Sequence, residues 1–408
     1  MQQFPKSFLW GAATSAYQTE GGNRWSDWWH WERSGNKIAD HTVSGSASDF
    51  WNQYKTYINL ARQAGMNCMR ISIEWARVNP EPGQWNDSAL KHYGAMLDCM
   101  REQGIEPIVT LWHFTLPQWL AERGGWMHRD SVKHFLEYVK RVNQAVGGKV
   151  TWWNTLNEPS VYLYEAYILG LWPPEHQFDL YQTTVIRNKL VRAHKLAYAI
   201  LKTKTNFVGI AANLSWDTGL SRVPVVNRIL EWLPPRGNDW SFLSAIKNQS
   251  DYIGLNFYFR QMIKTSWKPP FVSFSFMSQD KKRSSDLGWE IAPQGIYEVT
   301  KTLYKKFQKP ILITENGLAD AKDQKRAQFI KDHLYWLAKA FRERVPVLGY
   351  IHWALVDNVE WQLGKKPRFG LIEMDYQALR PEPRLSLWQY KKIIEEYTAN
   401  PPKKGSAQ

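Results

Sequence analysis

The chain has 408 residues, of which 44% are hydrophobic and 22% are charged, so its composition excludes global disorder and supplies ample material for a core. Its 52 Lys and Arg residues outnumber 38 Asp and Glu residues, which gives a formal net charge of +14. Because the basic residues are scattered, with only brief clusters at 280–286 and 364–368, and no nucleic-acid-binding motif accompanies them, we predict no nucleic-acid partner.

Short apolar runs recur along the chain, and longer segments with helical periodicity follow them. The runs cover 8–14, 68–75, 107–113, 150–156, 207–215, 251–259, 310–317 and 347–355. Helical periodicity is found at 49–65, 87–104, 130–146, 182–204, 293–308, 322–344 and 384–397. This alternation predicts an α/β fold, a single (β/α)8 TIM barrel with insertions in the rim loops. The competing doubly wound sheet would carry a G-x-G-x-x-G turn after an early strand, and the sequence has none.

We predict one barrel domain over residues 1–399 and a disordered tail at 400–408, because no linker or repeat interrupts the alternation. The apolar stretch from Phe8 to Ala13 is too short for a signal peptide and lacks a basic region before it. No run approaches the length of a membrane span, so we predict no membrane association.

Cys68 and Cys99 make neither a disulfide framework nor a zinc site, and we expect free thiols in a cytoplasmic protein. The oligomeric state is left open.

Polar and aromatic residues stand at or just beyond the ends of the predicted strands. The carboxyl ends of the strands of a TIM barrel carry the reactive residues. We therefore expect one polar site at this end of the barrel, to which the following residues contribute: Gln18, Arg70, Glu74, His113, Asn157, Glu158, Asn256, Tyr258, Glu315 and Trp353.

Two carboxylates in this set come from strands that face each other. "TWWNTLNEPS" (151–160) places Glu158 between Asn157 and Pro159, directly after a buried strand. Helix capping is one interpretation, because Asn157 would cap and Pro159 suits a first helical turn. "LITENG" (312–317) places Glu315 after the seventh strand, across the barrel mouth from the fourth. Two carboxyl groups opposed over a cleft are what cleavage of a glycosidic bond needs, so the pair favours that chemistry over two separate caps.

Several motifs in order along the chain resemble glycoside hydrolase family 1, the β-glucosidases and their relatives. They are "FLWGAATSAYQTEGG" near the start, "TLNEP", "ITENG" and "DNVEWQLG…RFGL" near the end, and the resemblance runs from about Phe4 to about Tyr397. It implies a retaining exo-β-glycosidase that hydrolyses β-D-glucosides, with β-galactosides and β-fucosides as further substrates. The implied partner is a small β-glycoside or β-linked oligosaccharide, and the resemblance implies no cofactor and no metal.

The resemblance also implies the role of each catalytic residue. Glu158 matches the acid/base and Glu315 the nucleophile that forms a covalent glycosyl-enzyme, and such a pair is expected about 5 Å apart. These roles require Glu158 protonated and Glu315 ionised at neutral pH. Arg70 is expected to hold Glu315 charged and Tyr258 to donate a hydrogen bond to it. The alternative left open is that Arg70 pairs with Glu74 or with an acidic residue of a helix instead.

For the sugar, the resemblance implies a platform at Trp353 and a set of hydroxyl-binding residues: Gln18, His113, Asn157, Glu360 and Trp361. His113 as a satisfied core residue is the alternative for that position. Phospho-glycosidases of the family replace the glutamate at the Glu360 position, so Glu360 favours unphosphorylated sugars over the alternative of a 6-phospho-β-glycosidase. A carbohydrate-binding barrel without turnover is the remaining alternative. We expect the aglycone mouth to be formed by 171–176, 231–239 and 265–288.

Overall fold

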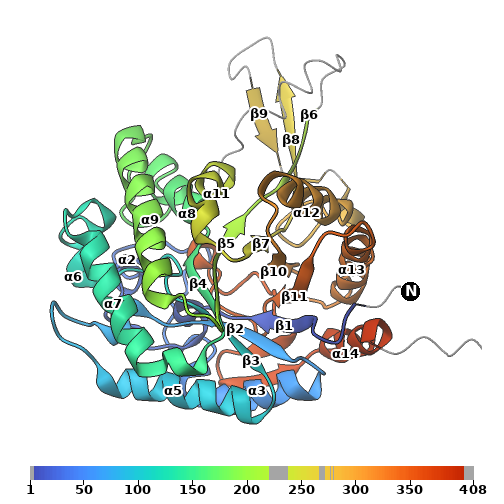
Figure 1. Ribbon diagram of the computed structural model, residues 1–408, viewed down its shortest axis with the longest axis horizontal. Helices are drawn as coiled ribbons and strands as arrows, with labels where there is room; N and C mark the ends of the chain where they lie inside the picture. Colours follow the sequence, from blue (N-terminus) through green and yellow to red (C-terminus); the bar gives the residue numbers. More distant parts are fainter. Residues whose placement is uncertain (1–3, 220–237, 266–271, 276, 279, 399–408) are drawn as a thin grey trace, which may run out of the picture.

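Eight parallel strands close into a barrel, with helices packed around its outside (Figure 1). The computed structural model describes residues 4–219, 238–265, 272–275, 277–278 and 280–398. The barrel strands are β1 (Leu9–Ala13), β2 (Cys68–Ser72), β3 (Glu106–Thr110), β4 (Trp152–Asn157), β5 (Phe207–Asn213), β7 (Ile253–Asn256), β10 (Ile311–Gly317) and β11 (Val347–Trp353). They follow one another around the barrel in chain order, and β11 pairs with β1 to close it. Each strand overlaps one of the eight apolar runs, so the predicted TIM barrel is confirmed.

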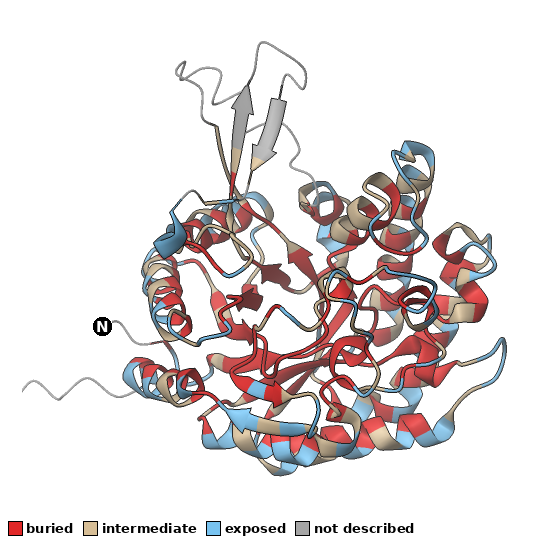
Figure 2. Cartoon of the chain, turned by 180° about the vertical axis from the view of Figure 1, so that it is seen from behind, coloured by how far each residue is buried: buried red, intermediate tan, exposed pale blue. Residues whose placement is uncertain are grey.

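A ring of helices covers the barrel, one after each strand. They are α3 (Phe50–Gln63), α5 (Asp87–Glu102), α7 (Ser131–Val146), α9 (Leu180–Leu201), α11 (Trp240–Ile246), α12 (Gln294–Phe307), α13 (Arg326–Arg342) and α14 (Leu385–Thr398). Figure 2 shows buried strands at the centre and helices with exposed outer faces, as expected for amphipathic helices on a barrel. Seven of the eight overlap predicted segments. The exception is α11, whose seven residues are too few to display a helical period.

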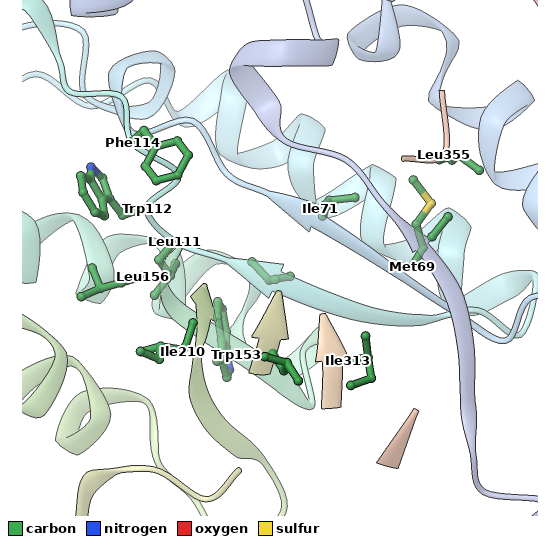
Figure 3. Packing of buried hydrophobic residues seen from close by; sticks show 14 of the residues in the cluster. Met69, Ile71, Leu111, Trp112, Phe114, Trp153, Leu156, Ile210, Ile313 and Leu355 are labelled. Carbon is green, nitrogen blue, oxygen red and sulfur yellow. The ribbon is translucent and has the colours of Figure 1, made fainter. Parts of the chain in front are cut away.

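Side chains on the strands alternate between the barrel interior and the layer beneath the helices, because successive residues of a strand point to opposite faces. On β2, Cys68 belongs to a small cluster drawn from strands all around the barrel, which can meet only inside it. Met69 and Ile71 belong instead to the large apolar cluster beneath the helices, part of which is shown in Figure 3. By this alternation Arg70 points into the barrel.

Two strands break the alternation just before they end. β4 shifts its register against β5 between Asn154 and Asn157. β10 shifts its register against β7 between Ile313 and Glu315, and it shifts against β11 in the same stretch. Strict alternation from Leu312, which lies in the interior cluster, would point Glu315 out of the barrel. A register shift re-aims the side chains that follow it, and here it turns Glu315 toward the interior.

Shorter elements form the rim insertions. A three-stranded sheet projects from the barrel (Figure 1) and consists of β6 (Trp216–Gly219), β8 (Arg260–Thr265) and β9 (Val272–Ser275). A hairpin is formed by β12 (Ile372–Asp375) and β13 (Arg380–Pro383). The short helices are α1 (Ala16–Thr19), α2 (Asp27–Trp31), α4 (Trp75–Val78), α6 (Gln118–Ala121) and α8 (Pro159–Leu163). Single helical turns are η1 (Gly125–Met127), η2 (Gly147–Lys149), η3 (Tyr164–Ile168), η4 (Lys247–Gln249), η5 (Lys281–Arg283) and η6 (Trp361–Leu363).

The apolar run at 251–259 contains more than one strand. β7 ends at Asn256, and β8 begins at Arg260 in the projecting sheet rather than in the barrel. The tail predicted at 400–408 lies outside the described residues, as do 231–237 and parts of 265–288 from the predicted aglycone mouth.

Candidate active site

A cavity of about 530 Å³ lies at the carboxyl end of the barrel strands. Its wall contains nine of the ten residues that were predicted to be catalytic or to bind the sugar, namely Gln18, His113, Asn157, Glu158, Tyr258, Glu315, Trp353, Glu360 and Trp361. The exception is Arg70, which is fully buried and contacts wall residues from inside the barrel. The structure therefore brings residues from all parts of the chain to one cavity.

Glu315 is held by two hydrogen-bond donors. Arg70 Nη1 forms an ion pair with Glu315 Oε1, and the Tyr258 hydroxyl donates to Glu315 Oε2 at 2.6 Å. Burial raises the pKa of Glu315, while Arg70 and Tyr258 act in the opposite direction. Burial and the charge of Glu315 raise the pKa of Tyr258 well above its usual value, so its hydroxyl keeps the proton that it donates.

Arg70 is fixed by contacts on neighbouring strands. Its Nε donates to Thr110 Oγ1 at 3.0 Å, and its Nη2 donates to Asn157 Oδ1 at 2.6 Å. The alternative pairing with Glu74 is wrong. Glu74 accepts instead from the Thr115 hydroxyl at 3.0 Å and from the backbone N–H of Ala76 at 3.1 Å, at the start of α4. Arg70 thus ties the nucleophile candidate to the residue that precedes the second carboxylate.

Glu158 stands between β4 and α8 with a left-handed backbone conformation, φ 40°. Although it occupies the position before the helix, its side chain makes no capping hydrogen bond, so helix capping does not account for the carboxylate. The carboxylate is 8% exposed and accepts a hydrogen bond of 2.7 Å from Asn256 Nδ2. Burial and the nearby charge of Glu315 raise the pKa of Glu158 well above its usual value. Of the two carboxyls, Glu158 therefore holds a proton more readily than Glu315, whose pKa Arg70 and Tyr258 lower.

The residues predicted to bind the sugar surround this pair. His113 Nε2 lies 3.3 Å from Asn157 Nδ2, and burial, with the charge of Arg70, lowers the pKa of His113 so that the ring is neutral. Burial and Glu315 raise the pKa of Glu360 to about 8, and Glu360 Oε2 is buried with no hydrogen-bond partner in the described part of the chain. Gln18 Nε2 donates to the backbone carbonyl of Val359 at 3.0 Å, which ties α1 to the loop carrying Glu360.

Two residues support the site without a predicted role. The sequence places Asn256 at the end of a predicted strand but gives it no role. In the structure its side chain donates a hydrogen bond to Glu158 and accepts one from the Thr314 hydroxyl at 2.7 Å. Asp239 was assigned to the aglycone mouth, but it is fully buried and accepts from the backbone N–H groups of Ser160 and Asn213 at 2.9 and 2.8 Å. No local sequence signal marks Asp239, because its partners are backbone groups distant in the chain.

A closed parallel barrel with two carboxylates in one cavity is the arrangement of a glycosidase. The sequence profile of glycosyl hydrolase family 1 matches residues 1–231 and 238–398, and the chain belongs to this family. β-Glucosidase A of Acetivibrio thermocellus is 31% identical over 443 residues, covering 96% of this chain and 98% of that protein.

Solved structures agree with this assignment. A β-glycosidase from Pyrococcus horikoshii is 34% identical with a TM-score of 0.90, covering 97% of this chain and 95% of the other. A β-glucosidase from Thermotoga maritima in complex with glucoimidazole is 29% identical with a TM-score of 0.91, covering 98% and 100%. The protein is therefore a β-glucosidase-type glycosyl hydrolase that acts with retention of configuration. It binds a glycoside, and the alternative of a carbohydrate-binding barrel without turnover is set aside.

The described ranges of the chain show neither a helix that could span a membrane nor a cluster of side chains that could hold a metal ion. No helix within them is both long enough and apolar enough to cross a membrane. Within the same ranges, no group of three or more His, Cys, Asp or Glu side chains is placed to hold a metal ion.

Proposed function

We propose that this enzyme removes terminal β-D-glucosyl units from small O-linked β-glucosides and β-linked oligosaccharides, with Glu315 as nucleophile and Glu158 as acid/base. One observation carries the assignment of roles. Glu315 is paired with Arg70 and Tyr258, which favour its ionised form, whereas Glu158 accepts only from the neutral amide of Asn256 within the described part of the chain. The two groups are thus prepared for opposite protonation states.

In the first step, the Glu315 carboxylate attacks the anomeric carbon and forms a glycosyl ester. The bond from that carbon to the glycosidic oxygen breaks, and the oxygen takes the proton of Glu158 as it leaves. Arg70 and Tyr258 then contact an ester instead of a carboxylate. Asn157, held by Arg70 Nη2 at 2.6 Å, is the candidate to bind the 2-hydroxyl beside the reacting carbon.

In the second step, Glu158 has to act as a base. Formation of the ester removes the charge of Glu315, which is one of the influences that raise the pKa of Glu158. The pKa of Glu158 therefore falls in the intermediate, as expected for coupled carboxyls. Glu158 takes a proton from water, the resulting hydroxide attacks the anomeric carbon, and the bond to Glu315 breaks, which restores both groups.

The rest of the cavity supports an unphosphorylated sugar at a chain end. A pocket that is closed by the barrel interior accepts the end of a chain rather than its middle. Glu360 Oε2 has no hydrogen-bond partner among the described residues, which suits a sugar hydroxyl, and a carboxyl group gives a phosphate no positive charge to pair with. Among the described residues of the wall there is no Lys or Arg to bind a phosphate. β-Galactosides and β-fucosides are further candidates, because they differ from glucosides mainly in the hydroxyls that such residues bind.

The roles are tested by trapping the intermediate. We expect 2,4-dinitrophenyl 2-deoxy-2-fluoro-β-D-glucopyranoside to inactivate the enzyme with release of one dinitrophenolate per chain, because fluorine slows the second step more than the first with so good a leaving group. Peptide mapping by mass spectrometry should find the fluoroglucosyl group on Glu315. A label on any other residue contradicts the proposal.

The acid/base is tested by chemical rescue. In Glu158→Ala, azide should take the place of the deprotonated water, and β-D-glucosyl azide should appear as the product. The matched control is Glu102→Gln on the exposed end of α5, which should behave as wild type with and without azide. Failure of azide to rescue, or an α-glucosyl azide, contradicts the role of Glu158.

We also propose a cytoplasmic location and partners limited to glycosides. The location is supported by the free thiols of Cys68 and Cys99, since a reducing compartment keeps thiols reduced. The absence of a nucleic-acid or membrane partner stays a prediction from the sequence.

A further inference from the structure

The wall of the active-site cavity has an unusual composition for a chain with a net charge of +14. Its described residues include four glutamates and no Lys or Arg. Nine aromatic side chains complete most of the wall: Phe114, Tyr164, Trp172, Tyr258, Phe259, Trp289, Trp353, Trp361 and Phe369. Carboxylates among aromatic faces are the groups that attract organic cations.

Three of the four glutamates belong to the machinery proposed above, and Glu165 does not. Its Oε2 atom is buried without a hydrogen-bond partner, and its side chain forms no ion pair among the described residues. Burial alone raises the pKa of Glu165 to about 7. A carboxyl oxygen that is removed from water without a hydrogen-bond partner costs stability, so a ligand that pairs with the carboxylate recovers part of that cost.

The position of Glu165 is on the leaving-group side of the cavity. It lies seven residues after Glu158, on the helical segment formed by α8 and the π-helical turn η3, and Val161 on the same segment also lines the cavity. At the helical rise of 1.5 Å per residue, Glu165 stands roughly 10 Å beyond Glu158, away from the barrel interior. The acid/base marks the glycosidic oxygen and the sugar lies toward Glu315 in the barrel interior, so we infer from the direction of this segment that Glu165 lies beside the aglycone.

A second buried acceptor lines the same cavity. Gln261 is 6% exposed, and its Oε1 atom has no hydrogen-bond partner among the described residues. Like Glu165, it offers an acceptor that awaits a donor from a ligand. An ammonium group provides several N–H donors and a positive charge, whereas a hydroxyl provides one donor and no charge.

We propose that Glu165 makes the leaving-group side of the cavity a subsite for aglycones that carry a cationic amine. The inference rests on the proposed function, because it takes the sugar to occupy the side of the cavity defined by Glu158 and Glu315. The ammonium group pairs with the Glu165 carboxylate, and the aromatic wall contacts the carbon skeleton and the face of the charge. Amine-bearing β-glucosides are then the favoured substrate class.

The test compares two glucosides that differ only in the terminal group of the aglycone. They are 4-(2-aminoethyl)phenyl and 4-(2-hydroxyethyl)phenyl β-D-glucopyranoside, assayed by glucose release at pH 8, where both the amine and Glu165 are charged. We expect wild type to favour the amine by about tenfold in kcat/KM, the size of a partly buried charged hydrogen bond. In Glu165→Gln the preference should fall to about twofold or less, and Glu102→Gln should keep it. A wild-type ratio near one, or an unchanged ratio in Glu165→Gln, overturns the proposal.

Binding of the free aglycones separates this proposal from the proposed function. Calorimetry with 4-(2-aminoethyl)phenol and 4-(2-hydroxyethyl)phenol needs no turnover, and we expect the amine to bind wild type about tenfold more tightly, with little difference in Glu165→Gln. If neither glucoside is hydrolysed while the amine preference in binding stands, the proposed function fails and the Glu165 subsite is supported. If the alcohol glucoside is hydrolysed and neither measurement shows a preference for the amine, the proposed function is supported and the Glu165 subsite fails.

Discussion

Glu158 and Glu315 carry the same side chain at the ends of two barrel strands, but the two carboxylates have different surroundings. β5 and β7 separate their strands, and each carboxylate follows a register shift in its own strand. Glu315 is held by a buried guanidinium and a tyrosine hydroxyl. Glu158 is held by one amide, at the start of a short helix.

The difference shows how one barrel prepares two identical groups for opposite tasks. Arg70 is paired with one carboxylate and only adjacent to the other, so it lowers the pKa of Glu315 more directly than that of Glu158. Burial raises the pKa of both groups, and the charged partner is what separates them. The predictions below remove the partners of each carboxylate in turn.

The largest effect is expected for Glu315→Gln. The amide oxygen is neutral and cannot form the glycosyl ester, so kcat on 4-nitrophenyl β-D-glucopyranoside should fall by about 10⁴-fold or more. Thermal unfolding should show a folded protein, because the amide keeps the shape of the side chain. A variant that keeps more than a few per cent of the activity would refute the assignment of the nucleophile.

Loss of the cation in Arg70→Met should be the next largest effect, with kcat/KM reduced by about 10²–10³-fold. Glu315 has to be ionised to react, and without Arg70 its pKa rises, so the acid limb of the pH–rate profile should move to higher pH. Arg70→Lys keeps the charge, so it should retain more of the rate than Arg70→Met and its acid limb should lie closer to that of wild type. An acid limb that stays in place in Arg70→Met is incompatible with the pairing.

Tyr258→Phe removes the second donor to Glu315, and we expect a loss of about tenfold, the size of a hydrogen bond to a charged group. The acid limb should again move to higher pH, but by less than in Arg70→Met, because a neutral donor lowers the pKa of Glu315 less than a cation does. The matched control is Tyr198→Phe, whose hydroxyl contacts Asp251 at 3.0 Å and lies outside the cavity wall. Equal effects of the two substitutions would contradict the role of Tyr258.

The smallest effect is expected for Asn256→Ala, the partner of Glu158. Hydrogen bonding from Asn256 lowers the pKa of Glu158 and also that of Glu315, so its loss should raise both pKa values and move both limbs of the profile to higher pH. Glu158 is protonated at the optimum in either case, and the rate there should fall by less than about tenfold. An alkaline limb that moves to lower pH would show that Glu158 is not the group that sets it.

Much of this architecture could be predicted from the sequence. Apolar runs that alternate with helical segments indicate a barrel, because a parallel strand buried on both faces is apolar along its length. Glu158 and Glu315 were found because each interrupts the end of such a run with a charge. Elements that depend on distant contacts could not be found this way, among them α11 and the sheet of β6, β8 and β9.

The support of the site was equally beyond the sequence. Asp239 accepts hydrogen bonds from backbone N–H groups of two other segments. Glu165 stands out because its Oε2 atom is buried without a hydrogen-bond partner among the described residues. Neither property has a local pattern, because burial and the absence of a partner are decided by residues far away in the chain.

The sequence by itself determined which residues end each strand, and with them the chemical groups at the mouth of the barrel. Strand periodicity is a local property that the order of the residues carries directly. Only the tertiary structure decided where those groups point and how they are charged. Register shifts in β4 and β10 turned the two strand ends toward the cavity, and burial with Arg70 set the two pKa values apart. Both depend on contacts between strands that exist only once the barrel has closed.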